Sequence, residues 1–131
     1  MIELTNLPKF PDERGNLSFF ENNNQIPFEI KRVHWIFDVP GGETRGGVAY
    51  RETEEFIIAL SGSFEVMIDD GVEQRSYSLN RSYHGVLVPK GSWRGINNFS
   101  TNSVALIVAS TPYDPADAIR DYAEFLNFTK K

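Results

Sequence analysis

The 131-residue sequence contains no cysteine, and it contains histidine only as His34 and His84. Without cysteine there is no disulfide, no thiolate nucleophile and no cysteine-ligated zinc site, which suits a reducing compartment such as the cytoplasm. No apolar run approaches the length of about 18 residues that a membrane span needs, and the N-terminus lacks the profile of a signal peptide. We therefore expect a soluble, cytoplasmic protein with no membrane partner.

The sequence also has fewer basic than acidic residues. There are 13 Lys and Arg residues against 18 Asp and Glu, which gives a net charge of −5 and a pI near 5.0. A nucleic-acid binder needs a basic surface to neutralise phosphates, so this composition argues against a nucleic-acid partner, although it leaves room for a local basic pocket. The length predicts one domain, residues 1–131, large enough to bury about two-thirds of the surface of the unfolded chain.

Short runs of alternating apolar and polar residues fill the middle of the chain, bounded by Gly, Pro, Asn and Asp, and this pattern is typical of half-buried strands. Ten Phe, five Tyr and two Trp also favour sheet. The predicted strands are residues 17–21, 31–38, 45–51, 55–60, 63–69, 72–79, 84–88, 92–97 and 103–109. The sequence Asp-Asp-Gly at 69–71 predicts a hairpin, because Asp70 and Gly71 tolerate a positive φ. Short strands at this spacing indicate a sandwich or a barrel.

Helical periodicity appears only near the C-terminus. Ala118, Tyr122 and Phe125 follow the spacing of a helix face, and Asp114 and Pro115 are suited to its N-cap and first position. We predict one C-terminal helix that packs on an all-β body.

Two spans resemble the signature motifs of the cupin superfamily of jelly-roll barrels. The first motif has a glycine, a His-x-His pair, a glutamate and a second glycine, and the second motif has Pro-x-Gly, a histidine and an asparagine. The matching residues here are Gly42, Val48, Tyr50, Glu55 and Gly62, then Pro89, Gly91, Arg94 and Asn98. We therefore predict an all-β cupin jelly-roll barrel with one short C-terminal helix, in which the glycines serve turns.

The residues at the four cupin metal-ligand positions are Val48, Tyr50, Glu55 and Arg94. Valine has no lone pair to donate, and arginine stays protonated and repels a cation. We predict that the site binds no metal and needs no cofactor.

Five stretches extend the resemblance across nearly the whole chain. They are "RGNLSFFE" at 14–21, "IPFEIKRVHWIFDVPGGETRGGVAYR" at 26–51, "LSGSFEVMIDDG" at 60–71, "VPKGSW" at 88–93 and "ASTPYDPADAIRDYAEF" at 109–125. These stretches are similar to the sugar 3,4-ketoisomerases of the WxcM-like family, which act on dTDP-4-keto-6-deoxyglucose. The resemblance implies a homodimer with exchanged N-terminal strands and a dTDP-linked sugar, or a similar anionic small molecule, bound at the barrel mouth.

The same resemblance implies a reaction of deoxysugar and polysaccharide biosynthesis that moves a ketone from C4 to C3 without a metal. The family motif Arg-Gly-x-His-x-His reads Arg45, Gly46, Gly47, Val48, Ala49 and Tyr50 here, and Arg94 replaces a further histidine that follows the tryptophan. Such a reaction needs a base beside the carbonyl carbon and donors for the oxyanion. The candidate proton carriers are Tyr50, Glu55 and His34.

Three arginines near the motifs suit a diphosphate, because guanidinium groups bind phosphates through paired hydrogen bonds. These candidates are Arg45, Arg51 and Arg94, and the aromatic rings of Tyr83 and Trp93 are candidates for stacking on thymine or sugar. Three interpretations follow from the sequence: an isomerase with a rebuilt proton-transfer site, a sugar-nucleotide-binding or regulatory module without catalysis, and a scaffold or dimerisation domain with an unrelated ligand.

Overall fold

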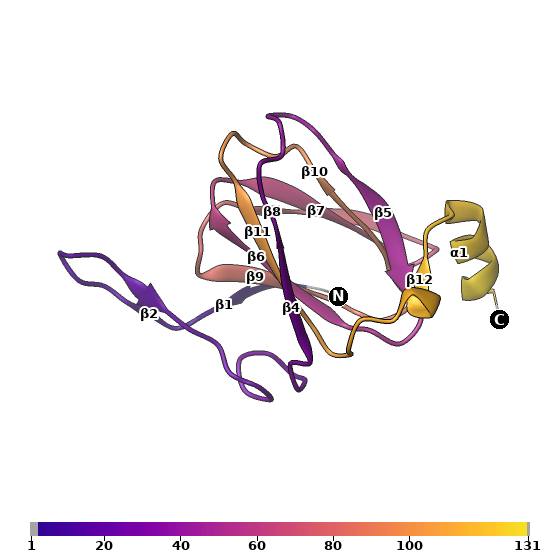
Figure 1. Cartoon of the computed structure of the whole chain (residues 1–131), viewed down its shortest axis with the longest axis horizontal. Coiled ribbons are helices and arrows are strands. Elements are labelled where there is room, and N and C mark those ends of the chain that lie inside the picture. The colour runs from indigo at the N-terminus through magenta and orange to yellow at the C-terminus, as the bar shows by residue number, and fades with distance from the viewer. Residues whose placement is uncertain (1–2, 131) are drawn as a thin grey trace.

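The computed structural model describes residues 3–130 as two packed five-stranded sheets, a small hairpin and one C-terminal α-helix (Figure 1). The strands are β1 (Leu4–Asn6), β2 (Lys9–Phe10), β3 (Leu17–Ser18), β4 (Arg32–Ile36), β5 (Arg45–Tyr50), β6 (Glu55–Ser61), β7 (Phe64–Asp69), β8 (Gln74–Leu79), β9 (His84–Val88), β10 (Trp93–Asn97), β11 (Val104–Ala109) and β12 (Ala118–Ile119). The first sheet has the order β1-β9-β6-β11-β4 and the second β12-β5-β10-β7-β8. The strand pairs described in these sheets are antiparallel, and the predicted all-β jelly roll is confirmed.

The main core lies between the two sheets and is made of inward side chains from both. Its largest buried members are Ile57, Phe64, Leu79, Ile96, Phe99 and Ile107. The glycines of the cupin-like frame serve as predicted: Gly42, Gly62 and Gly91 all have positive φ angles. At Gly62 a Cβ would also lie 2.8 Å from the backbone of Ser103, so a side chain there would clash as well as strain the turn.

The outer face of the first sheet is covered in part by the N-terminal segment. Leu7, Ile26 and Phe28 pack there against Phe56 and Ile58 of β6. Because β6 is covered on both faces, five of its residues from Glu55 onward are buried, and its sequence is a nearly continuous apolar run.

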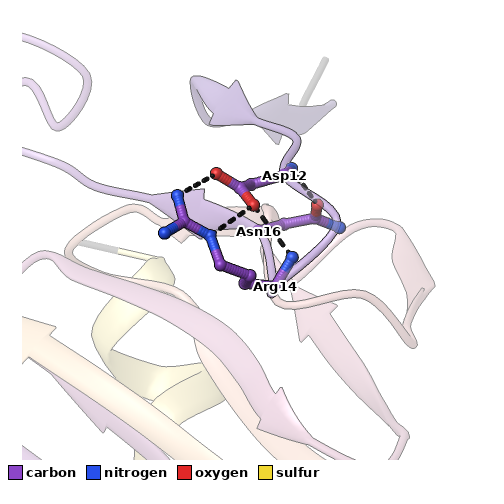
Figure 2. Close-up of polar contacts among 3 residues, drawn as sticks. All are labelled: Asp12, Arg14 and Asn16. Atoms are coloured by element: carbon purple, nitrogen blue, oxygen red, sulfur yellow. Dashed lines mark hydrogen bonds and ion pairs between the residues drawn. The ribbon is translucent and has the colours of Figure 1, made fainter.

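The β2–β3 hairpin extends away from the two large sheets, on the side opposite the C-terminal helix (Figure 1). Its turn is held by its own side chains, as Figure 2 shows: Asp12 accepts hydrogen bonds from the Arg14 backbone and guanidinium, and Asn16 accepts one from the Asp12 backbone. The Arg14 hydrogen bonds lower the pKa of Asp12. Phe10 and Leu17 of this hairpin remain more than half exposed.

The hairpin predicted at 69–71 is confirmed. Strands β7 and β8 pair from Phe64 with Leu79 to Asp69 with Gln74, and Gly71 has a φ of 94°. Asp70 contributes through its carboxylate, which accepts hydrogen bonds from the two backbone N–H groups of Val72 and Glu73.

The C-terminal helix is confirmed, but its predicted start at Pro115 is wrong. Asp114 and Pro115 begin only a short 3₁₀ turn, Pro115–Asp117, and the chain then pairs with β5 as strand β12. This pairing buries Ile119, so the α-helix begins later as α1 (Tyr122–Thr129), capped by Asp121. No helix within residues 3–130 has both the length and the apolar character needed to cross a membrane.

Candidate functional site

A cavity of about 780 Å³ lies between edge strand β4 of the first sheet and strands β5 and β10 of the second. Its walls come from β4, β5, β10 and the segment that leads to α1. The lining residues are Arg32, Val33, His34, Ile36, Thr44, Arg45, Gly46, Gly47, Val48, Tyr50, Arg94, Tyr113 and Arg120. The cavity therefore contains four of the eight predicted site residues, His34, Arg45, Tyr50 and Arg94.

Strand alternation turns the candidate functional side chain of β4 toward this cavity. Along β4, Arg32, His34 and Ile36 are half-buried, whereas Val33 and Trp35 between them are exposed. On β10, Arg94 lies opposite Val48 of β5. These registers bring the imidazole of β4, the phenol of β5 and the guanidinium of β10 to one cavity.

Four arginines line the cavity, and three of them lack a carboxylate partner within residues 3–130: Arg32, Arg45 and Arg120. The Nε atom of Arg32 is buried and has no hydrogen-bond partner there. The Arg32 guanidinium lies 6.0 Å from the centre of the Tyr50 ring and 5.7 Å from that of Tyr113. The cavity is thus a concentration of positive charge on a protein whose net charge is −5.

Arg94 is the exception, because it is paired with Glu55 of β6. Its Nε donates to Oε1 at 2.8 Å and its Nη2 donates to Oε2 at 3.1 Å, and both side chains are buried. Burial alone would lower the pKa of Arg94, but the attraction and hydrogen bonds of Glu55 outweigh it, so the pKa is raised. Glu55 is held behind Arg94 and is not among the residues that line the cavity.

His34 is the histidine that faces the cavity. Burial lowers its pKa, and the nearby cations Arg32 and Arg94 lower it further, so that the opposing attraction of Glu55 is outweighed. Its Nδ1 atom is buried without a hydrogen-bond partner in residues 3–130. The imidazole is therefore neutral near pH 7, with a lone pair available on one ring nitrogen.

The pKa of Tyr50 is shifted in the opposite direction, upward. Burial and the negative charge of Glu55 raise its pKa, and the attraction of Arg94, Arg32 and Arg120 only partly compensates. Near neutral pH the side chain is a protonated phenol, which can donate a hydrogen bond or a proton but cannot serve as a base.

The structure places three predicted substrate-binding residues outside this cavity. Arg51 donates to the Ala116 carbonyl at 3.0 Å and to Glu124 at 3.2 Å, beside the start of α1. Trp93 follows the alternation of β10, so it points away from Arg94 and packs in an aromatic cluster with Tyr122 and Phe125. Tyr83, directly before β9, packs against His84 and beneath Lys9.

Nine of the lining residues were not among the predicted site residues, and three of these nine carry a cationic or aromatic side chain: Arg32, Tyr113 and Arg120. Arg32 could have been found from the sequence, because it lies two residues before His34 and therefore on the same face of a strand. Tyr113 and Arg120 follow the last long strand, and no local pattern places that segment over the cavity.

The four positions of the cupin metal ligands do converge, since Val48, Tyr50 and Arg94 line the cavity and Glu55 binds Arg94. In the part of the chain that the structure describes, no three His, Asp or Glu side chains are grouped so that they could hold a metal ion.

A family model described as FdtA, WxcM-like, C-terminal matches residues 1–130. The chain belongs to the WxcM-like family. A TDP-4-oxo-6-deoxy-alpha-D-glucose-3,4-oxoisomerase of Aneurinibacillus thermoaerophilus is 37% identical over 129 residues, which are 98% of this chain and 93% of that protein.

Solved structures of similar proteins share the fold. A 3,4-ketoisomerase from Helicobacter canadensis has a TM-score of 0.95 and 38% identity, covering 99% of this chain and 98% of its own. The sugar 3,4-ketoisomerase QdtA from Thermoanaerobacterium thermosaccharolyticum, in complex with TDP, has a TM-score of 0.94 and 30% identity, covering 98% and 94%. A mutant of that protein is in complex with TDP-4-keto-6-deoxyglucose. The family match and the structural similarity therefore both span nearly the whole chain.

Proposed function

We propose that this WxcM-like protein binds a dTDP-linked 4-keto-6-deoxyhexose in the cationic cavity and moves its ketone from C4 to C3. The observation that carries the proposal is the group of three cavity arginines, Arg32, Arg45 and Arg120, that have no carboxylate partner within residues 3–130. Relatives that are named as enzymes of this reaction, and one that is in complex with TDP, support the choice of ligand.

A diphosphate suits these arginines for a physical reason. The buried Nε of Arg32 has lost its water without gaining a partner in the free protein, which costs about 1–3 kcal/mol. A phosphate paired with the Arg32 guanidinium would neutralise a charge that has no carboxylate partner within residues 3–130, and the surrounding positive charge would attract the anion to the cavity. Tyr113, whose ring lies near the Arg32 guanidinium and is 71% exposed, offers a surface for a sugar or base ring.

The isomerisation itself requires a base at C3 and a donor at the carbonyl oxygen. The cavity holds a neutral imidazole, His34, and a protonated phenol, Tyr50, and these are the two kinds of group that the chemistry needs. A non-catalytic binding module is the second candidate function. It is favoured by Val48, which occupies a motif histidine position and cannot transfer a proton.

We further propose that the protein is a homodimer in which N-terminal strands are exchanged. The outer face of β4 and its neighbours leaves Trp35, Phe37 and Leu60 between 48% and 58% exposed, and the projecting hairpin leaves Phe10 and Leu17 exposed to a similar extent. Apolar surface of this kind is typical of an interface, and a second copy can supply both a hairpin and a sheet face.

Calorimetric titration with dTDP tests the binding proposal. Replacing Arg32 with Gln removes charge-assisted hydrogen bonds to phosphate, and we expect the Kd to rise about ten- to a hundredfold. Arg75→Gln is the matched control, because Arg75 lies on β8 and pairs with Glu73. Failure of the wild-type protein to bind dTDP, or equal binding by the two variants, would contradict the proposal.

Product analysis separates the enzyme from the binding module. With dTDP-4-keto-6-deoxyglucose, ¹³C NMR should show the ketone signal move from C4 to C3 in the presence of protein. A protein that binds dTDP but leaves the ketone at C4 is the non-catalytic module.

Light scattering after size exclusion tests the dimer. We expect twice the chain mass of 14.9 kDa for the wild-type protein and for Val72→Asp, which changes a hairpin residue that is 96% exposed. Trp35→Asp should shift the protein toward the monomer. A wild-type monomer would contradict the dimer proposal.

A further inference from the structure

We propose that His34 of β4 is the general base that takes the C3 proton of the bound 4-keto sugar, with Tyr50 of β5 as the donor to the carbonyl oxygen. This inference rests on the proposed function and assigns its proton transfers to two residues. It places the base on a different strand from the two histidine positions of the family motif, which are Val48 and Tyr50 on β5.

The other candidate bases are excluded by their surroundings. Glu55 is buried, does not line the cavity and has both carboxylate oxygens bound to Arg94. His84 lies on β9, paired with Asn6 and packed against the Tyr83 ring, and it does not line the cavity. Val48 has no proton to exchange. Among the lining residues, His34 therefore combines access to the cavity with a neutral lone pair.

Two features of His34 suit a base. The strand register places its half-buried side chain on the same face as Arg32, and this face also turns toward the Tyr50 ring, because the Arg32 guanidinium lies over that ring at 6.0 Å. Nδ1 is buried and has no hydrogen-bond partner within residues 3–130, so the C3 proton is taken by the other ring nitrogen, Nε2. No described hydrogen bond contributes to the pKa of the imidazole, so none holds it in its charged form.

The transfers balance as follows. His34 takes the proton from C3, the C3–H electron pair becomes the C3–C4 double bond, and the C4 carbonyl oxygen takes the phenolic proton of Tyr50. The products of this half are an enediol, an imidazolium and a phenolate, and Arg32 and Arg94 stabilise the phenolate. The phenolate then takes the proton of the O3 hydroxyl, the C3 carbonyl forms, and C4 takes the proton of the imidazolium.

Burial and the charged groups around His34 set the pKa of its imidazole, and therefore the pH range in which it can act as a base. Arg32 on its own strand and Arg94 of β10 disfavour the imidazolium, Glu55 of β6 favours it, and burial lowers the pKa most. Tyr50 of β5 is uncharged at neutral pH, and Arg45 and Arg120 add positive charge at the cavity wall. We therefore expect kcat/KM to rise with pH through a transition below the ordinary histidine pKa, then to level off.

Steady-state kinetics of His34→Gln test the inference, with His84→Gln as the matched control. We expect His34→Gln to lower kcat by about 10²–10⁴-fold and to abolish the pH transition. The control should keep both the rate and the transition. The dTDP affinity of His34→Gln should match the wild-type value, which shows that the fold and binding site persist. His34→Asn is made in parallel so that a folding defect in one variant does not remove the test.

The outcomes separate this inference from the proposed function. Wild-type turnover together with near wild-type turnover of the folded His34 variants overturns the role of His34 and leaves the proposed function intact. No ketone transfer by the wild-type protein overturns both. Turnover that is lost in the His34 variants, retained in His84→Gln and slowed by deuterium at C3 supports the inference.

Discussion

Arg94 of β10 holds Glu55 of β6 through two hydrogen bonds, and both side chains are buried, although only Arg94 lines the cavity. The two residues occupy positions at which the cupin motifs carry a metal-binding histidine and glutamate. In this chain the carboxylate neutralises a guanidinium, and a cation at the same place would have to displace it. The two hydrogen bonds to Glu55 fix the position and orientation of the Arg94 guanidinium at the cavity wall.

Breaking this pair should destabilise the protein strongly. Glu55→Gln leaves the buried charge of Arg94 without its carboxylate, so we expect the free energy of unfolding to fall by about 3–5 kcal/mol in urea denaturation. Glu124→Gln is the control, because its exposed pair with Arg51 contributes about 1 kcal/mol or less. Equal stability of the two variants would mean that Arg94 finds another partner.

Adjacent glycines in β5 should respond differently to alanine. A Cβ at Gly47 would lie 2.3 Å from the Trp93 ring, whereas a Cβ at Gly46 would meet nothing within 4 Å. Gly47→Ala should cost about 1–3 kcal/mol of stability by overpacking, and it should change Trp93 fluorescence. Gly46→Ala should leave both unchanged or raise the stability slightly. A stable Gly47→Ala protein with unchanged fluorescence would contradict this packing.

Arg45 begins strand β5 and Arg51 directly follows its end, and the structure predicts different roles for the two arginines. Arg45 lines the cavity, whereas Arg51 is engaged with Ala116 and Glu124. In calorimetric titrations, Arg45→Gln should weaken dTDP binding about tenfold or more, and Arg51→Gln should leave it unchanged. Weakened binding by Arg51→Gln would place the phosphates nearer to α1.

The lowered pKa of His34 makes stability depend on pH. Between the folded-state pKa and the ordinary value near 6.5, the unfolded chain binds more protons than the folded chain, so the stability rises with pH across that window and is lost on acidification. Urea unfolding should show the wild-type protein losing stability relative to His34→Gln as the pH falls below about 6.5. A constant difference between the two proteins would show that the pKa of His34 is unshifted. The titration of its ring protons by NMR measures the same quantity.

Much of the fold could be predicted because the alternation of apolar and polar residues along a strand reflects which of its side chains are buried. Strand β9 lies at the predicted residues 84–88, and the other long strands differ from prediction by a few residues at their ends. The strands β1, β2 and β12 were not predicted, because strands of two or three residues carry too little alternation to be recognised. The start of α1 was misplaced because Ala118 and Ile119 pair with β5, a tertiary contact that overrides a good local cap at Asp114.

The site was less accessible to sequence reasoning, because it depends on which face of each strand turns inward. Trp93 and Arg94 are neighbours on one strand, so only one of the two can face the cavity, and alternation alone does not say which. The register with Ala49 and Val48 decides it. Arg120 enters the cavity from a segment 26 residues beyond Arg94, a relation that no local motif contains.

Solvent-deuterium exchange tests the central claim most directly, namely that this cavity is a working proton-transfer site without the motif histidines. dTDP-4-keto-6-deoxyglucose is incubated with the protein in deuterated water and followed by ¹H NMR. We predict that the C3 proton signal disappears as a C3 ketone forms, and that this loss is abolished in His34→Gln but not in His84→Gln. A C3 signal that persists unchanged with the wild-type protein, although dTDP binds, would contradict the claim.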